Sequence, residues 1–404
     1  MVRISDDEDI LFHRPMRMID VNSEHHQLQL TRRSCTRIIM LMMNSKVALI
    51  IFSAAAAALL ILMKMMLMTT TNSIYQTKIG PSLELTFLPS STSSNIYKFK
   101  IIQIADIHLG EAQDTDWGAE QDVKSYHALQ SILAHESNAN LLILSGDQIT
   151  ANDVNNNATD YYMELGDFMD SYNTPWGLIF GNHDDADFGN KTYHHSAKTL
   201  RQDLLKAIQH YNYGMTQQES PMEVFGVSNY VLNVYLQGTV AVQIFMLDSG
   251  GGSLPKTLHQ SQLDWMTTIR INNTTPAVVF QHVPTQQYVF NDKECVGTNG
   301  DGGFDPLDDD TGIVDYLTKD GNVHFLAVGH NHGNSYCCPT SRNNVVLSLC
   351  FGRHSGYGGY GNLDRGARVY ELSVDTENGY FSYKSWVQME SGDVTEMYIP
   401  ATNS

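Results

Sequence analysis

Five short polar motifs, each directly following an apolar strand-like run, constrain this chain more than any other feature. They are Asp106-Ile107-His108, Gly146-Asp147, Gly181-Asn182-His183-Asp184, Gln281-His282 and Gly329-His330-Asn331-His332. The apolar runs before them have the length and composition of buried strands. Because loops that leave the ends of neighbouring strands meet at one edge of a sheet, we expect these polar side chains to lie close together.

The apolar runs alternate with stretches of helical periodicity. Strands are expected at residues 98–105, 141–144, 176–180, 241–247, 277–280, 323–328 and 345–349, and helices at 121–136, 161–172 and 195–210. This alternation predicts an α/β (α+β) domain over residues 97–390, with sheets covered by helices and no internal repeat. Residues 291–310, rich in Gly and Asp, are expected to form a long loop, and loops of this length in a compact domain are often functional.

The N-terminal part of the chain has a different character. Residues 47–68 are almost entirely apolar and predict a transmembrane helix at the short end of the usual range. We expect a cytosolic tail at 1–46, a stalk or linker at 69–96, and a C-terminal tail at 391–404. Basic residues cluster before the apolar run, namely Arg32, Arg33, Arg37 and Lys46. The positive-inside rule therefore predicts a single-pass type II membrane protein whose large domain is luminal or extracellular. A buried alanine-rich helix is the alternative.

Two further patterns bear on compartment. Acceptor triplets for N-glycosylation begin at Asn157, Asn190, Asn272 and Asn273. Of five cysteines, Cys35 precedes the apolar run, and four follow it: Cys295, Cys337, Cys338 and Cys350. These four permit one or two disulfides in an oxidising compartment, or they stay as free buried thiols, and the pairing is left open. The formal charge of −19 argues against a nucleic-acid partner.

The residue types in the five motifs are those of a metal centre. Histidine suits zinc, iron or manganese, and Asp and Asn supply oxygen ligands. Two cations about 3.5–4 Å apart need a bridging carboxylate, because a shared anion offsets their mutual repulsion. A single D-x-H or G-D pair is more often structural. Five in this order predict a two-metal site of Fe, Zn or Mn.

The order D-x-H, GD, GNHD, H and GHNH resembles that of the calcineurin-like metallophosphoesterases, and the resemblance covers nearly all of residues 98–390. Within that superfamily the chain is similar to the purple-acid-phosphatase-related branch typified by plant enzymes and a fungal phosphatase, notably at residues 351–372. The resemblance implies a four-layer β-sandwich of two mixed sheets flanked by helices.

The resemblance also implies roles for individual residues. One metal would be held by Asp106, His108 and His332, the other by Asn182, His282 and His330, and Asp147 would bridge them. His183 would contact the phosphate, together with Asn182, and protonate the leaving oxygen. The chain departs from the family's pattern at Thr150, where purple acid phosphatases have a metal-binding tyrosine. The purple colour that this tyrosine gives when it binds ferric iron is therefore not expected here.

The function expected from this resemblance is that of an acid-phosphatase-like, metal-dependent phosphatase. It would hydrolyse monoesters of a phosphorylated small molecule or phosphoprotein by attack of a metal-bridging hydroxide. Action on phosphodiesters or pyrophosphates, and a non-catalytic membrane-tethered binding protein, are the alternatives. Asp184 is expected either to orient His183 in catalysis or to stabilise its turn. Arg353 and His354 are candidates for substrate contact, and Tyr357 and Tyr360 are expected to form a packed turn.

Overall fold

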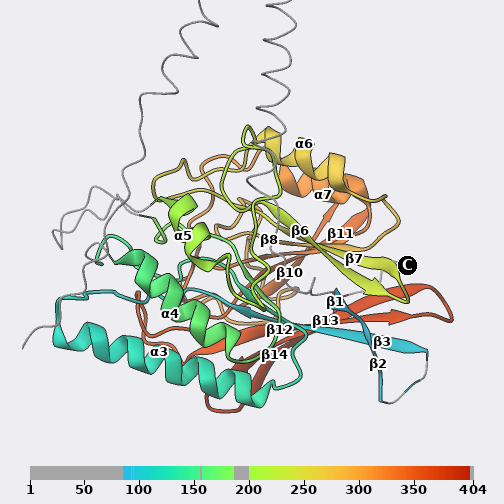
Figure 1. Ribbon diagram of the computed structural model, residues 1–404. Helices are drawn as coiled ribbons and strands as arrows, with labels where there is room; N and C mark the ends of the chain where they lie inside the picture. The colour runs from blue at the N-terminus through green and yellow to red at the C-terminus, as the bar shows by residue number, and fades with distance from the viewer. Residues whose placement is uncertain (1–84, 92, 94, 155–156, 186–199, 401–404) are drawn as a thin grey trace, which may run out of the picture. The chain divides into compact units, whose positions relative to one another are not determined.

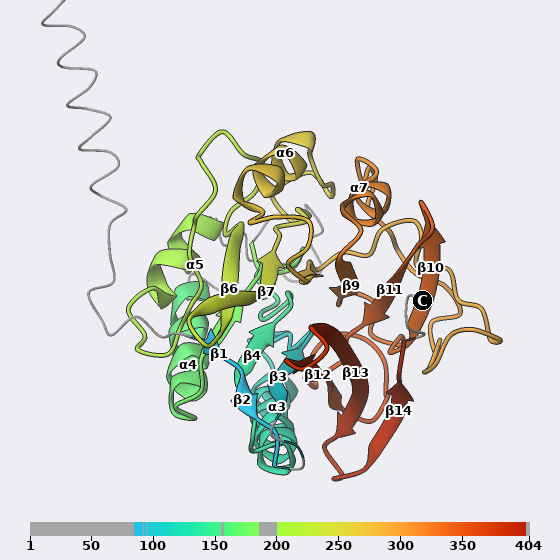
Figure 2. The ribbon, with the colours of Figure 1, turned by 90° about the vertical axis from the view of Figure 1, so that its right-hand side faces the viewer.

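The computed structural model describes residues 85–400 except 92, 94, 155–156 and 186–199. Within this part of the chain, two mixed sheets lie face to face (Figures 1 and 2). The strand order of the first is β1 (Leu85–Thr86), β6 (Tyr230–Leu236), β7 (Thr239–Met246), β8 (Ala277–Phe280), β9 (Val323–Val328), β11 (Val345–Phe351) and β10 (Cys337–Arg342). The order of the second is β14 (Val394–Tyr398), β13 (Tyr380–Met389), β12 (Gly366–Asp375), β3 (Ile96–Ile104), β4 (Leu141–Leu144) and β5 (Trp176–Leu178), with β2 (Leu88–Pro89) also paired to β3.

Helices cover the outer face of each sheet. The second sheet is covered by α3 (Asp116–His135), α4 (Ala158–Asp170) and α5 (Arg201–Ile208), and the first by α6 (Gln260–Ile269) and α7 (Ile313–Asp320) (Figure 1). Alternation along β3 shows how the layers form: Phe99 and Ile101 pack between the sheets, whereas Ile102 and Ile104 pack toward the helices. The prediction of two mixed sheets flanked by helices is confirmed.

Helix α3 begins earlier than the predicted residue 121. Thr115 has an extended backbone, and its Oγ1 accepts a hydrogen bond from the Gly118 amide at 3.1 Å. Asp116 in the first turn adds a favourable interaction with the helix dipole. An N-cap of this kind stabilises a first turn that lacks an apolar pattern.

The folded unit is longer than the predicted 97–390 at both ends. Strands β1 and β2 lie in the segment assigned to a stalk, and Leu85 is paired with Val234 in the first sheet. Strand β14 lies in the segment assigned to a C-terminal tail, where Val394 pairs with Gln388. Both boundary predictions are wrong at these strands, because two-residue strands and a polar edge strand have no apolar run to identify them.

The apolar segment 47–68 lies outside the described residues, as does Asn190. None of the helices in the described part of the chain has the length and apolar composition that a membrane crossing requires.

Two disulfides link the four C-terminal cysteines. Cys337 faces Cys350 across the antiparallel β10–β11 ladder, and these two are bonded. Cys295, in the long loop before α7, is bonded to Cys338. The prediction of one or two disulfides is confirmed, and the free-thiol alternative is wrong.

Candidate metal centre

The five motifs lie on loops that leave β3, β4 and β5 of the second sheet and β8 and β9 of the first. Four of their residues have positive φ although they are not glycine: Asp106 (57°), His108 (53°), Asp147 (54°) and His330 (75°). Such backbone conformations are costly, and active sites and ligand-binding loops are among the places where they cluster. Gly181 permits the close approach of two loops, since a Cβ there would lie 2.2 Å from Asp147 Oδ1.

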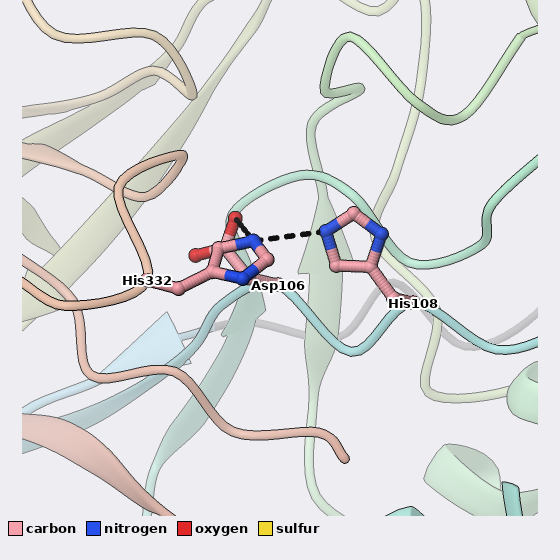
Figure 3. Close-up of side chains that lie close together, drawn as sticks. All are labelled: Asp106, His108 and His332. Carbon is pink, nitrogen blue, oxygen red and sulfur yellow. Dashed lines mark hydrogen bonds and ion pairs between the residues drawn. The ribbon is translucent and has the colours of Figure 1, made fainter. Parts of the chain in front are cut away.

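One cluster consists of Asp106, His108 and His332, which are buried and face one another (Figure 3). His332 Nε2 lies 3.1 Å from His108 Nε2 and 3.9 Å from Asp106 Oδ1. The other ring nitrogens face outward: His332 Nδ1 donates to the Tyr360 carbonyl at 2.9 Å, and His108 Nδ1 is hydrogen-bonded to Thr150 Oγ1 at 2.9 Å. Outer partners of this kind orient the imidazoles and direct both Nε2 atoms to one point.

A second cluster consists of Asp147, His282 and His330, with Asn182 beside it. His282 Nε2 lies 3.1 Å from Asp147 Oδ2 and 3.0 Å from Asn182 Oδ1. Its Nδ1 lies 2.9 Å from the Ser145 carbonyl, to which it donates a hydrogen bond. His282 is thus oriented in the same way as the histidines of the first cluster.

Asp147 lies between the two clusters. Its Oδ2 is 3.1 Å from His282 Nε2 and 3.6 Å from His108 Nε2, so one carboxylate oxygen faces a histidine of each cluster. Its Oδ1 accepts a hydrogen bond from the His183 amide at 2.7 Å. This is the arrangement that a bridging carboxylate requires.

Burial sets the charges of the first cluster. It raises the pKa of the Asp106 carboxyl to about 7 and lowers the pKa of His332 to about 4, and it also holds the pKa of His108 well below its usual value. Burial also lowers the pKa of His282, but the charge and hydrogen bond of Asp147, the charge of Asp106 and the hydrogen bond to Ser145 together outweigh it and raise the pKa of His282 to about 9. The His108 and His332 rings are therefore neutral at pH 7, the form that binds a metal ion.

The residues present fit two metal ions. His330 Nδ1 is buried and has no hydrogen-bond partner among the described residues, while its Nε2 lies 3.1 Å from Asp305 Oδ2. Each cluster combines carboxylate oxygen with imidazole nitrogen, a donor set suited to zinc, iron or manganese. The structure therefore brings together all of the predicted ligands in two candidate clusters.

A cavity of about 340 Å³ opens beside the two clusters. Its lining residues are His108, Glu111, Asp147, Thr150, His183, Asp305, His330, Asn331, His332, Gly359 and Tyr360. The His183 ring is edge-on to that of His108, with centroids 4.9 Å apart. A phosphate group in this cavity could reach both clusters and His183.

The contacts of Asp184 support the second of its two predicted roles, the stabilisation of its turn. It is fully buried, and its Oδ2 accepts hydrogen bonds from the amides of Asp147 (2.9 Å) and Gly181 (2.7 Å). Its Oδ1 accepts from the amides of Gln148 (2.8 Å) and Ile149 (3.2 Å). Because backbone amides donate hydrogen bonds to both of its oxygens, Asp184 stabilises the turns that carry Asp147 and Asn182.

Arg353 and His354 are absent from the residues that line the cavity, so the structure does not support their prediction as substrate contacts. Arg353 donates to the Asp364 carbonyl through Nε (3.0 Å) and Nη2 (2.7 Å). The buried His354 ring packs against His332, with centroids 4.1 Å apart. The reason is that the loop after β11 runs beneath the first motif, where Ala105 and His354 form a parallel bridge.

Among the residues of the cavity wall that the sequence did not assign to the site are Tyr360, Asp305 and Glu111. Tyr360 is 52% exposed and stacks flat on His332, with centroids 4.1 Å apart and planes 9° apart, so it is not simply part of a packed turn. Asp305 lies in the long loop, and Glu111 accepts a hydrogen bond from the Gly359 amide. The one signal that pointed to any of them was the length of the loop at 291–310.

The glycosylation triplets differ in exposure. Asn272 and Asn273 are exposed, between α6 and β8, whereas Asn157 is half-buried at the N-cap of α4. Within its turn, Asn272 Oδ1 accepts hydrogen bonds from the Thr274 and Thr275 amides at 2.9 and 2.7 Å.

Comparison with protein families places this fold and site in a known class. The calcineurin-like phosphoesterase family model matches residues 99–334, and the chain belongs to this family. Among its relatives is the probable inactive purple acid phosphatase 28 of Arabidopsis thaliana, 25% identical over 350 residues, which cover 78% of this chain and 84% of the relative. Phosphatase DCR2 of Saccharomyces cerevisiae is 26% identical over 316 residues, 70% of this chain and 52% of that protein.

Among solved structures, purple acid phosphatase PPD1 from yellow lupin aligns with 74% of this chain and 53% of its own, at 13% identity and a TM-score of 0.45. The chain thus spans about half the length of DCR2 and of the lupin enzyme. The predicted resemblance to purple-acid-phosphatase-related proteins is confirmed.

Proposed function

We propose that this protein is a dinuclear metal-dependent phosphoesterase that hydrolyses phosphate monoesters. The observation that carries the proposal is the position of Asp147, whose Oδ2 faces His282 of one cluster and His108 of the other. A donor set divided in this way around a shared carboxylate is suited to holding two cations beside a phosphate.

Charge explains how such a site would act. Two bound cations would neutralise the phosphate oxygens and lower the pKa of a water molecule for attack on phosphorus. The chain contributes His183 in the cavity wall, with its backbone held by Asp147 Oδ1, and this imidazole would donate a proton to the departing oxygen. Asn182 precedes His183 on the same turn and lies beside the second cluster, where it would contact a phosphate bound to that metal, although it does not line the cavity itself.

Two alternatives use the same residues. The cavity is large enough for a small phosphorylated molecule or a phosphorylated side chain, and diesters or pyrophosphates would meet the same two clusters. Some relatives carry names that call them probable inactive. A non-catalytic binding protein is therefore the second candidate, although every predicted ligand is retained in this chain.

The test measures metal content and hydrolysis together. The full chain would be assayed against an aryl phosphomonoester and an aryl phosphodiester across pH, with metals determined by elemental analysis. Asp147→Asn should abolish turnover and lower the metal content, while Asp264→Asn, an exposed carboxylate on α6, should change neither. A folded, metal-loaded protein that hydrolyses neither ester would rule out the proposal and favour the binding protein.

We further propose that the chain is a type II membrane glycoprotein with its catalytic domain luminal or extracellular. The apolar segment 47–68, the basic residues before it and the two disulfides after it support this topology. Protease protection in intact microsomes and a glycosidase-sensitive mobility shift that is reduced in Asn272→Gln/Asn273→Gln would test it. A C-terminal domain digested from the cytosolic side would reverse the topology.

A further inference from the structure

The loop at residues 291–310 packs along the loop that carries His330 and His332. The Cys295–Cys338 disulfide and a 2.8 Å hydrogen bond from the Gly300 amide to the Gly333 carbonyl attach it there. Isolated bridges between Val296 and Cys337 and between Asn299 and Asn334 extend the contact. The loop is therefore held at a defined position beside the metal centre.

Two aspartates of this loop reach the two histidines. Asp305 Oδ2 lies 3.1 Å from His330 Nε2. Asp301 acts through Tyr360, whose hydroxyl donates to Asp301 Oδ2 at 3.0 Å and accepts from the His332 amide at 3.0 Å. The contact from Asp305 is the direct one, because it reaches an imidazole nitrogen.

The orientation of His330 differs from that of the other three histidines. In His108, His282 and His332 the outer partner is at Nδ1, and Nε2 faces the centre. In His330 the outer partner is at Nε2, and Nδ1 is buried without a hydrogen-bond partner in the described part of the chain. His330 must therefore offer the opposite nitrogen to a metal.

A carboxylate can fix this choice. An ionised carboxylate only accepts hydrogen bonds, so Asp305 favours the tautomer of His330 with its proton on Nε2 and its lone pair on Nδ1. Lys256 holds Asp305 in place, with Nζ 2.8 Å from Oδ1 and 2.9 Å from Oδ2. The chain Lys256–Asp305–His330 thus ends at the cluster that contains Asp147 and His282.

We propose that Asp305 is a positioning residue of the metal centre, which selects the Nε2–H tautomer of His330 and so directs Nδ1 to the metal held with Asp147 and His282. The inference rests on the proposed two-metal centre and does not require that the centre turn over a substrate. Outer-shell partners of ligand histidines typically contribute about 10–100-fold to metal affinity. Because the Asp305 side chain is 60% exposed, we expect an effect of about tenfold.

The chain offers a matched control in Asp308. This carboxylate is in the same loop, is 78% exposed and lies 4.0 Å from Lys256 Nζ, and it does not line the cavity. Asp305→Leu and Asp308→Leu remove the same charge with side chains of the same shape. Asp305→Asn is the conservative variant, since its amide oxygen can still accept the Nε2–H bond.

The experiment titrates Zn²⁺ into the metal-free full chain by calorimetry, with elemental analysis of the loaded protein and the unfolding temperature of the metal-free form. Asp305→Leu should weaken one of the two sites about tenfold and leave the other site and the unfolding temperature unchanged. Asp305→Asn should recover part of the loss, and Asp308→Leu should bind as the wild type does.

Three outcomes would overturn the inference. The first is wild-type affinity at both sites in Asp305→Leu, and the second is an equal loss in Asp308→Leu. The third is a wild-type chain that binds no Zn²⁺, which would remove the metal centre as well. A wild type that binds two metals without hydrolysing an ester would contradict the proposed phosphatase activity, while the difference between the Asp305 and Asp308 variants would still support the positioning role.

Discussion

Asp184 ties the turn after β4 to the turn after β5, since its two carboxylate oxygens accept four backbone amides from those turns. Asp184→Asn should therefore destabilise the protein, because one oxygen becomes an NH₂ group that faces backbone N–H donors. Buried groups left without a partner cost about 1–3 kcal/mol each, so we expect a loss of roughly 3 kcal/mol in the free energy of unfolding. Urea denaturation of the metal-free protein measures it.

The control for Asp184→Asn is Asp203→Asn. Asp203 is a half-exposed residue of α5 that pairs with Lys206 at 3.3 Å, and exposed pairs of this kind contribute at most about 1 kcal/mol. Unchanged stability in Asp184→Asn, with hydrolysis alone reduced, would restore the catalytic role that the sequence suggested.

His324 on β9 makes stability depend on pH. Burial, with a smaller contribution from Arg270, lowers the pKa of His324 to about 4. The unfolded chain, with a histidine pKa near 6.5, then binds the proton more tightly, so stability is full above about pH 6.5 and falls as the pH drops toward 4. Allowing for the partial exposure of the ring, the loss is on the order of 2 kcal/mol.

His324→Gln should remove this contribution, because glutamine does not titrate. The free energy of unfolding of both proteins would be measured in urea with a chelator present, at several pH values between 4 and 7. The variant should lose less stability than the wild type across this range. Parallel pH profiles would show that His324 is as readily protonated in the folded protein as in the unfolded chain.

At the scale of elements, β14 completes a buried polar network at the edge of the second sheet. Arg368 on β12 is fully buried and donates to Phe351 O (2.6 Å), Ser385 Oγ (3.0 Å) and Glu396 Oε2 (3.1 Å). A chain that ends at residue 390, the predicted domain boundary, loses Glu396 and leaves the guanidinium without this carboxylate. Removing one partner of a buried ion pair costs about 3–5 kcal/mol.

The comparison is between a chain ending at residue 390 and one ending at residue 400, which keeps β14. The shorter chain should unfold at a clearly lower urea concentration, whereas the longer one should match the full protein. Equal midpoints for the two would mean that β14 is a dispensable edge strand. In that case a chain that ends at the predicted boundary, residue 390, would be as stable as the longer one.

Parallel strands were easier to predict than antiparallel ones. Strands β8 and β9, buried on both faces, have the boundaries predicted from their continuous apolar runs. Besides the two-residue strands β1 and β2, strands β6, β10, β12, β13 and β14 were not predicted. In β13, buried Phe381, Tyr383 and Ser385 alternate with half-buried Ser382 and Lys384, so no continuous apolar run marks it. A search for alternation would have found this strand.

For the molecule as a whole, the metal centre depends on the packing of one sheet against the other. Asp106 and His332 come from loops after β3 and β9, which belong to different sheets, and they meet in one cluster. Neither sheet carries a complete cluster among the described residues. Substitutions that alter the packing between the two sheets should therefore disturb the metal centre even when every ligand residue is retained.

The ligand residues could be identified from the sequence because each one follows a strand whose apolar run is local, and because five such motifs occur in one order along the chain, although a single one is more often structural. Their outer partners could not. Thr150, Asp305 and Tyr360 lie 42, 25 and 28 residues from the histidines that they contact, so loop packing alone brings them together. The same holds for the burial of Arg353 and His354 and for the amides that occupy Asp184. Chemical type is a property of the single residue, whereas contacts between distant loops depend on how two sheets and their connections pack.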